Sequence, residues 1–148
     1  MPDTATITAT EQFLHEQIPL SAAMGVRVEA FDCHRLILSA PLEPNHNHLG
    51  TAFGGSLAVL ATLAGYGLLW LELGDRECHI VIRRSSISYE RPVRGRLRAI
   101  CRQPDETELA GFKDAFLKKG KARILLHVTI EENDEVCVLF EGIFVAIR

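Results

Sequence analysis

The sequence of 148 residues lacks the marks of several protein classes. It has no excess of positive charge, since 16 Lys and Arg stand against 19 Asp and Glu for a net charge of −3. A nucleic-acid-binding domain is strongly basic, so no nucleic-acid partner is expected. The four cysteines include no C-x-x-C pair, so neither a zinc site nor a disulfide framework is predicted. Cys101 and Cys137 stand in apolar alternating segments, where we expect buried free thiols.

Targeting and linker segments are also missing. The N-terminal stretch MPDTATITATEQFLHEQ has neither the basic start nor the apolar core of a signal peptide, which predicts a reducing, cytoplasmic location. No repeat, linker or low-complexity segment interrupts the chain, and 148 residues suffice for one domain with a substantial core. We therefore expect a single domain over residues 1–148.

One segment is long, apolar and free of charge. The 20 residues from Ala52 to Leu71 would span about 30 Å as a helix, which matches the thickness of a bilayer core. Four glycines interrupt the segment, and no cluster of Lys or Arg flanks it to set an orientation in a membrane. A helix that is apolar all round can equally be enclosed by protein. We therefore predict a buried central helix and no membrane partner.

The rest of the chain favours strands. Thr8 and Glu11 have the spacing of a helix-capping box, and Pro19 should end that first helix. Two short strands are expected around a turn at Asp32, over residues 25–32 and 34–41. After the central helix we expect four strands, with one helix inserted at residues 105–120; the strands cover residues 78–90, 96–102, 121–130 and 136–148. This order predicts an α+β protein in which an antiparallel sheet wraps around the central helix.

The entrance to the central helix carries a motif that resembles a known family. Residues 47–55, NHLGTAFGG, are similar to the N-H-x-G-T-x-H-G-G entrance of hot-dog thioesterases of the phenylacetate-degradation type. Residues 86–97, SISYERPVRGRL, resemble the strand segment that follows the helix in those enzymes. GTAFGGSL, with Phe at the final His position, most resembles the thioesterase family of the YiiD C-terminal type. The resemblance implies a hot-dog fold, a long central helix wrapped by antiparallel sheet, and hydrolysis of acyl-CoA or acyl-carrier-protein thioesters.

The paired glycines of this motif suit that chemistry on physical grounds. Gly54 and Gly55 at a helix start let a ligand approach backbone N–H groups that have no intrahelical partner. These donors and the helix dipole stabilise a carbonyl oxygen that gains negative charge during acyl transfer. We predict that the Gly55 N–H polarises the thioester carbonyl. The alternative is that the two glycines only allow close packing of the helix against the sheet.

Two asparagines precede the glycines. The resemblance implies that Asn47 orients the thioester carbonyl or the attacking water, and Asn45 takes that place if the loop is displaced. Each asparagine can instead bond its own loop backbone, as asparagine does in turns.

The chain departs from the related enzymes at two positions. Phe53 stands where they have His, and Thr62 stands where they have an Asp that activates water. Thr62 can position a water molecule but cannot accept its proton at neutral pH. No acidic residue occurs from Ala52 to Leu71, so the candidates for the general base are Glu43, Glu90 or a group from a second subunit, and the alternative for Glu90 is a solvated strand residue.

Further residues are candidates for substrate contact. Seven arginines occur from Arg83 to Arg102, and three of them alternate in a way that places them on one face of a strand. They form either a solvated sheet face or a site for the phosphates of coenzyme A. The proposed substrate-binding residues are Asn45, Phe53, Gly54, Ser56, Ser88 and Arg94. His46 and His48 form H-x-H without further ligands at a workable spacing, so no metal is predicted, and no cofactor beyond the coenzyme A of the substrate.

The last two strands are apolar on both faces, which predicts pairing with a second subunit in a homodimer or tetramer. Three functions remain open: a thioester hydrolase, a non-catalytic acyl-CoA-binding or regulatory module, and a dehydratase-like relative. A dehydratase would require a His paired with an acid in the pocket. The missing acid on the central helix keeps the binding module open.

Overall fold

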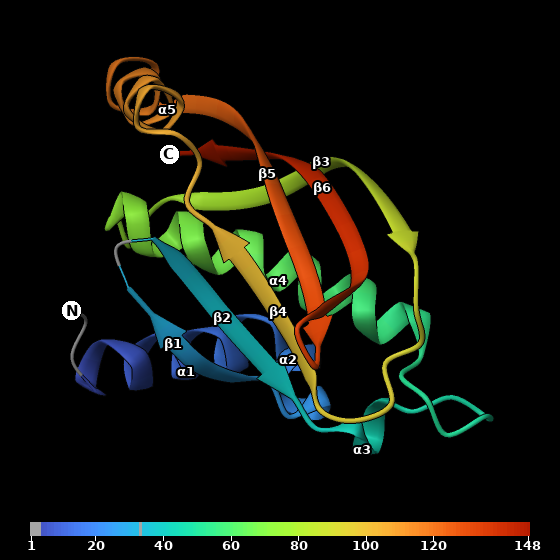
Figure 1. The fold of residues 1–148 in the computed structure, drawn as a ribbon. Coiled ribbons are helices and arrows are strands. Elements are labelled where there is room, and N and C mark those ends of the chain that lie inside the picture. The colour runs from blue at the N-terminus through green and yellow to red at the C-terminus, as the bar shows by residue number, and fades with distance from the viewer. Residues whose placement is uncertain (1–3, 33) are drawn as a thin grey trace.

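A single six-stranded antiparallel sheet wraps around one long helix in the computed structural model, which describes residues 4–32 and 34–148 (Figure 1). The elements run in the order α1 (Thr4–Gln17), α2 (Pro19–Met24), β1 (Arg27–Phe31), β2 (Arg35–Ala40), α3 (Leu42–Asn45), α4 (Gly54–Leu73), β3 (His79–Tyr89), β4 (Leu97–Arg102), α5 (Glu106–Lys119), β5 (Lys121–Glu132) and β6 (Glu135–Ile147). This is the predicted arrangement of an antiparallel sheet around a central helix, so the expected α+β hot-dog architecture is confirmed.

The strand order is β1-β2-β4-β5-β6-β3, and every neighbouring pair is antiparallel. β1 and β3 therefore form the two edges. The turn between β1 and β2 is held by Asp32, whose carboxylate accepts the backbone N–H groups of His34 and Arg35 at 2.7 and 2.9 Å. These bonds, with the backbone donor of His34 first, lower the pKa of Asp32.

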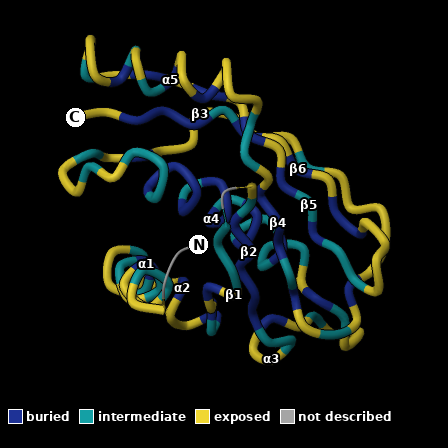
Figure 2. The backbone as a smooth tube through the Cα atoms, turned by 60° about the vertical axis from the view of Figure 1, so that its left-hand side comes forward, coloured by how far each residue is buried: buried dark blue, intermediate teal, exposed yellow. Residues whose placement is uncertain are grey.

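The central helix α4 forms the core. Half of its 20 residues are buried and the rest are partly buried, while strands β2 and β4 are buried along most of their length (Figure 2). The helix is long and apolar enough to cross a membrane. Its contacts with strands β2 to β6 instead supply the apolar surroundings that its side chains require, as the sequence predicted. Gly74 ends α4 in the left-handed conformation with φ 62°.

Helix α5 covers one end of the sheet and is anchored to α4 by a partly buried carboxylate. Asp105 caps α5 by accepting the N–H groups of Thr107 and Glu108. The Glu72 carboxylate, near the end of α4, accepts Lys113 Nζ at 3.0 Å and the Gln103 amide. Glu72 is therefore engaged in holding α5.

Several sequence predictions need correction. Helix α1 begins at Thr4, so Thr8 lies inside the helix and the predicted capping box is wrong. Pro19 does follow the end of α1, but it also occupies the first turn of α2, where its missing N–H costs nothing. The short α3 was not predicted. β4 begins only at Leu97, so Arg94 precedes the strand and does not share a strand face with Arg98.

The predicted burial of two thiols is confirmed. Cys101 and Cys137 are 0% and 2% exposed. Burial raises the pKa of the Cys101 thiol to about 12, so this thiol stays protonated at physiological pH.

Candidate functional site

The start of α4 presents backbone donors without acceptors. Phe53 is the N-cap residue in extended conformation and gives no side-chain cap. Leu57 donates the first N–H of the helix, to the carbonyl of Phe53 at 3.1 Å. The N–H groups of Gly54, Gly55 and Ser56 therefore have no acceptor within the described part of the chain. Together with the dipole of a 20-residue helix, they form a site for an oxygen that carries negative charge.

Two aromatic rings flank these donors. The ring of Phe53 lies against Gly55, so closely that a Cβ on Gly55 would overlap it. Tyr89, the last residue of β3, donates its hydroxyl to the carbonyl of Gly54 at 3.2 Å, and its ring lies 3.5 Å from the place of a Gly54 Cβ. Both rings are about half exposed, at 55% and 50%. The two glycines therefore sit between two rings that a ligand can contact.

Sequence reasoning selected Ser88 for this site and missed Tyr89. Tyr89 pairs with the fully buried Val138, whereas Ser88 pairs with the exposed Leu139. Successive strand residues point to opposite faces, so Tyr89 turns toward α4 and Ser88 turns to the outer face of the sheet. Ile87 is partly buried against the core and lies two residues before Tyr89, so the two side chains share the inner face of β3. The apolar Ile87 was therefore the sequence signal that Tyr89, and not Ser88, points inward.

Asn47 holds its own loop. Its Oδ1 accepts the N–H groups of Leu49 at 2.9 Å and Thr51 at 3.2 Å. Its Nδ2 donates to Thr51 Oγ1 at 3.0 Å and to the carbonyl of Ala52 at 3.5 Å. The amide is thus occupied within residues 47–52, which is the turn role left open by the sequence. Asn47 shapes the entrance, and its side chain is not free to hold a thioester carbonyl.

Replacing Asn47 by Ala should therefore lower the free energy of unfolding. We expect a loss of about 1 kcal/mol, because two backbone donors lose their acceptor. Asn47→Asp keeps an oxygen for both donors and should lose less. Urea denaturation of the two variants measures this difference. A stability of the Ala variant equal to that of the unsubstituted protein would show that the loop does not depend on this side chain.

Asn45 is likewise structural. It is 3% exposed, and its Nδ2 donates to the carbonyls of Met24 at 2.8 Å and Pro41 at 2.9 Å. The Asn45 carbonyl accepts the N–H of Phe53 at 2.8 Å. The residue thereby ties the segment before α4 to the end of α2, and its side chain does not face a substrate.

Thr62 and Ser56 both lie on α4, at different distances from its start. Ser56 is in the first turn and partly exposed. Thr62 follows Gly55 by seven residues, or about 10 Å along the helix axis. The Thr62 hydroxyl donates to the carbonyl of Ala58 at 2.8 Å. Thr62 is therefore too far from Gly55 in the same chain for both to contact one carbonyl group.

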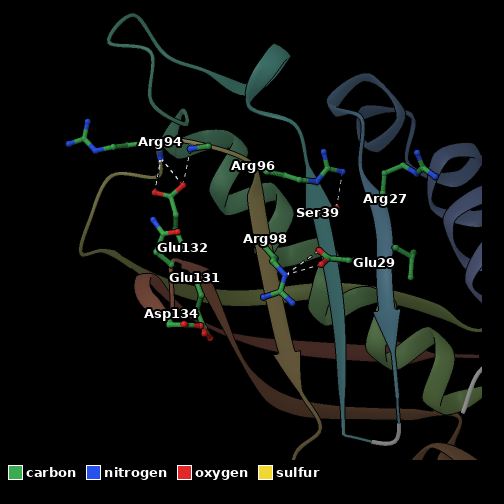
Figure 3. A pocket seen from close by; sticks show the side chains of 12 residues that line it. Arg27, Glu29, Ser39, Arg94, Arg96, Arg98, Glu131, Glu132 and Asp134 are labelled. Carbon is green, nitrogen blue, oxygen red and sulfur yellow. Dashed lines mark hydrogen bonds and ion pairs between the residues drawn. The ribbon is translucent and has the colours of Figure 1, made fainter.

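The arginines after Tyr89 border a charged pocket of about 930 Å³ on the outer face of β1, β2 and β4 (Figure 3). Arg98 pairs with Glu29 at 3.1 Å, and Arg96 donates to Ser39 Oγ at 3.0 Å. The carboxylate of Glu132 accepts the backbone N–H of Arg94, and Figure 3 shows the Arg94 side chain extending away from the pocket. No carboxylate among the described residues pairs with the Arg94 guanidinium.

Arg94 lies next to the entrance of α4. The carbonyl of Val93, the preceding residue, accepts the N–H of Ala52 at 2.8 Å. This bond ties the turn that carries Arg94 to the segment just before Phe53. Within residues 4–32 and 34–148, no group of three His, Cys, Asp or Glu side chains is placed to hold a metal ion.

Comparisons with known proteins identify the family and the fold. A family profile described as "Putative thioesterase (yiiD_Cterm)" matches residues 7–148. A solved structure of a protein of unknown function from Chlorobaculum tepidum TLS is 40% identical, with a TM-score of 0.89 over 97% of this chain and 94% of that one. A "putative thioesterase" from Shewanella oneidensis is 31% identical, with a TM-score of 0.85 over 96% of this chain and 97% of that one.

A more distant structure extends the likeness of fold. A thioesterase from Haemophilus influenzae is 17% identical and has a TM-score of 0.74, over 100% of this chain and 93% of that one. Its fold, with a long helix enclosed by antiparallel sheet, is the one found here. The family profile spans nearly the whole chain and two relatives exceed 30% identity over almost their full lengths. The protein therefore belongs to the YiiD C-terminal thioesterase family and has its hot-dog fold.

Proposed function

We propose that the protein hydrolyses acyl thioesters of coenzyme A or acyl-carrier protein at the start of α4. The observation that carries the proposal is the set of N–H groups of Gly54, Gly55 and Ser56, which lack acceptors and lie between Phe53 and Tyr89. Membership of a thioesterase family supports thioester cleavage as the reaction.

The reaction follows from this geometry. The thioester carbonyl oxygen accepts the Gly55 N–H, and water attacks the carbonyl carbon to give a tetrahedral oxyanion. Collapse of this intermediate re-forms the carbonyl, breaks the carbon–sulfur bond and releases a thiolate and a carboxylic acid. The proton from the attacking water passes to a base, and the thiolate takes up a proton on release. Gly55 contributes most in the transition state, where the negative charge on oxygen is largest.

The general base that accepts the proton of the attacking water must come from outside α4. Glu72 is the acidic residue of α4, and its carboxylate already binds Lys113 and Gln103. Glu90 and Glu43 are both exposed. Glu90 directly follows Tyr89, whose hydroxyl contacts Gly54, so Glu90 is the better placed of the two along the chain. A second copy of the chain is the other source of the base.

A second copy is proposed on separate grounds. β3 is an 11-residue edge strand, and nearly all its residues are exposed. An edge of this length is a template for pairing with another strand. We therefore propose a homodimer joined along β3. Light scattering should give twice the 16.4 kDa of one chain, and a mass of one chain would contradict the pairing.

We also propose that Arg94 binds a phosphate of coenzyme A, because none of the described carboxylates pairs with its guanidinium and the turn that carries it is bonded to the segment before Phe53. Arg94→Ala should raise KM for an acyl-CoA about tenfold, the loss of one charge-assisted hydrogen bond. It should not raise KM for the same acyl group on N-acetylcysteamine, which has no phosphate. Arg123→Ala, at an exposed position on β5, is the control. An equal rise in KM for both thioesters would refute phosphate binding.

Release of free thiol from a panel of acyl-CoAs tests the hydrolase directly. We expect turnover above the uncatalysed rate for at least one acyl group. The competing function is a non-catalytic acyl-CoA-binding module, and the absence of an unengaged acid on α4 favours it. If an acyl-CoA raises the melting temperature and no thiol is released from any substrate, the binding module is the correct function.

A further inference from the structure

An apolar groove runs along α4 away from the paired glycines. It encloses about 270 Å³ and is lined by Ile18, Ala58, Val59, Thr62, Leu63 and Tyr66. Only Thr62 and Tyr66 bring side-chain polar atoms to it, and the Thr62 hydroxyl donates to the carbonyl of Ala58 within the helix. The groove therefore offers an environment for a hydrocarbon chain.

The position of the groove connects it to the thioester site. Residues four apart on a helix lie on one face, so Ala58 and Val59 follow Gly54 and Gly55 on the same face one turn later. Along the row Gly54, Ala58, Thr62 and Tyr66 the side chains grow from a hydrogen atom to an aromatic ring. The groove begins at Ala58, one turn after the glycines, and its lining ends at Tyr66.

Tyr66 is held in place from the N-terminal helix. Its ring stacks on Phe13 of α1, with centroids 6.3 Å apart, and Phe13 stacks on Trp70 with centroids 4.3 Å apart. Burial raises the pKa of the Tyr66 hydroxyl, so the side chain is neutral at physiological pH. The wall formed by Ile18 comes from the junction of α1 and α2. The Tyr66 end of the groove is therefore a packed aromatic stack.

We propose that this groove binds the acyl chain and that Tyr66 sets the maximum chain length, an inference that rests on the proposed thioesterase function. From Gly55, which receives the carbonyl, to Tyr66 the helix rises about 16 Å. An extended chain advances roughly 1.2 Å per bond, since three backbone bonds span about 3.5 Å. An acyl chain that starts at Gly55 therefore reaches Tyr66 at about 12 to 14 carbons. Each methylene that enters it should raise kcat/KM by a factor of about four, until Tyr66 is reached.

The test is the dependence of kcat/KM on chain length, from butyryl-CoA to stearoyl-CoA. For the unsubstituted protein we expect a maximum near about 12 to 14 carbons. Tyr66→Ala should move the maximum to longer chains and raise kcat/KM for palmitoyl-CoA at least about tenfold, the value of two buried methylenes or more. Ala58→Leu narrows the groove where it begins and should move the maximum to shorter chains. Leu20→Ala, an exposed position on α2 outside the groove, is the control.

Four outcomes are distinguishable. If both groove variants keep the chain-length profile of the unsubstituted protein, the groove does not bind the acyl chain. If Ala58→Leu instead changes the oligomeric state and leaves the profile unchanged, the groove belongs to a subunit contact and the inference is wrong. If Tyr66→Ala does not fold, Ala58→Leu alone decides between these results. If no acyl-CoA is hydrolysed at all, the thioesterase function fails, and calorimetric affinities of the same acyl-CoAs for the same variants test the groove separately.

Discussion

We expect the Gly55→Ala variant to lose thioesterase activity while keeping its fold. A Cβ on Gly55 would overlap the ring of Phe53, so the ring has to move, and we expect the displaced ring to hinder the approach of a carbonyl to the Gly55 N–H. Loss of one oxyanion donor lowers the rate by a factor of about 100 to 1,000, and we expect kcat/KM to fall by this amount. Phe53 is 55% exposed, so its displacement should cost little stability.

Gly54→Ala is the matched comparison. Its Cβ would meet the Tyr89 ring at 3.5 Å, an ordinary contact, so a much smaller loss is expected. Kinetics of free-thiol release and thermal melting of both variants separate the two effects. Equal activities of Gly54→Ala and Gly55→Ala would mean that the Gly55 N–H has no special role. A large fall in melting temperature for Gly55→Ala would support the alternative, in which the glycines serve only helix packing.

The largest effect on stability is expected from Gly65→Ala. A Cβ there would lie 2.5 Å from Cζ and 2.7 Å from Cε1 of Phe144, a ring that is 0% exposed and cannot move aside. Overpacking of this kind costs about 3 kcal/mol, which is roughly 6 to 12 °C in melting temperature for a chain of this size. Urea and thermal unfolding measure the loss.

Gly111→Ala is the control for the Gly65 prediction. Gly111 lies inside α5, and nothing lies within 4 Å of the place of its Cβ. Replacing a helical glycine by alanine in open space should stabilise the protein by about 0.5 to 1 kcal/mol. If Gly65→Ala were as stable as Gly111→Ala, the close packing of α4 against β6 at Phe144 would not exist in solution.

The fold was predictable because several local signals agree. The strands alternate with period two, α5 is bounded by Asp105 and Gly120, and the central segment is apolar on every side. The sequence predictions that failed concern the ends of helices and strands, where tertiary contacts decide the boundary. Thr8 has capping-box spacing but lies in the middle of α1, a helix that packs on β1 and starts earlier than its cap signal. Arg94 alternates with Arg96 in sequence, yet the strand begins only at Leu97.

The candidate site was predictable only where backbone chemistry defines it. The start of α4 at the paired glycines could be predicted because it depends on backbone chemistry and on no side chain. Side-chain roles were harder, since asparagine serves a turn and a ligand equally well, and only the hydrogen bonds of Asn47 and Asn45 show which applies. Choosing Ser88 instead of Tyr89 is an error of one residue along β3. In a strand, a shift of one position moves the chosen side chain from the inner face of the sheet to the outer face.

The central claim is that the Gly55 N–H receives the thioester carbonyl. The most direct measurement is the amide resonance of Gly55 in ¹H–¹⁵N spectra as an acyl-CoA ketone is added, in which a methylene replaces the sulfur and prevents hydrolysis. We predict that the Gly55 amide proton moves downfield on saturation, as for a new hydrogen bond to a carbonyl. If the ketone binds and shifts other amides while the Gly55 resonance stays in place, the carbonyl is held elsewhere and the proposed mechanism is wrong.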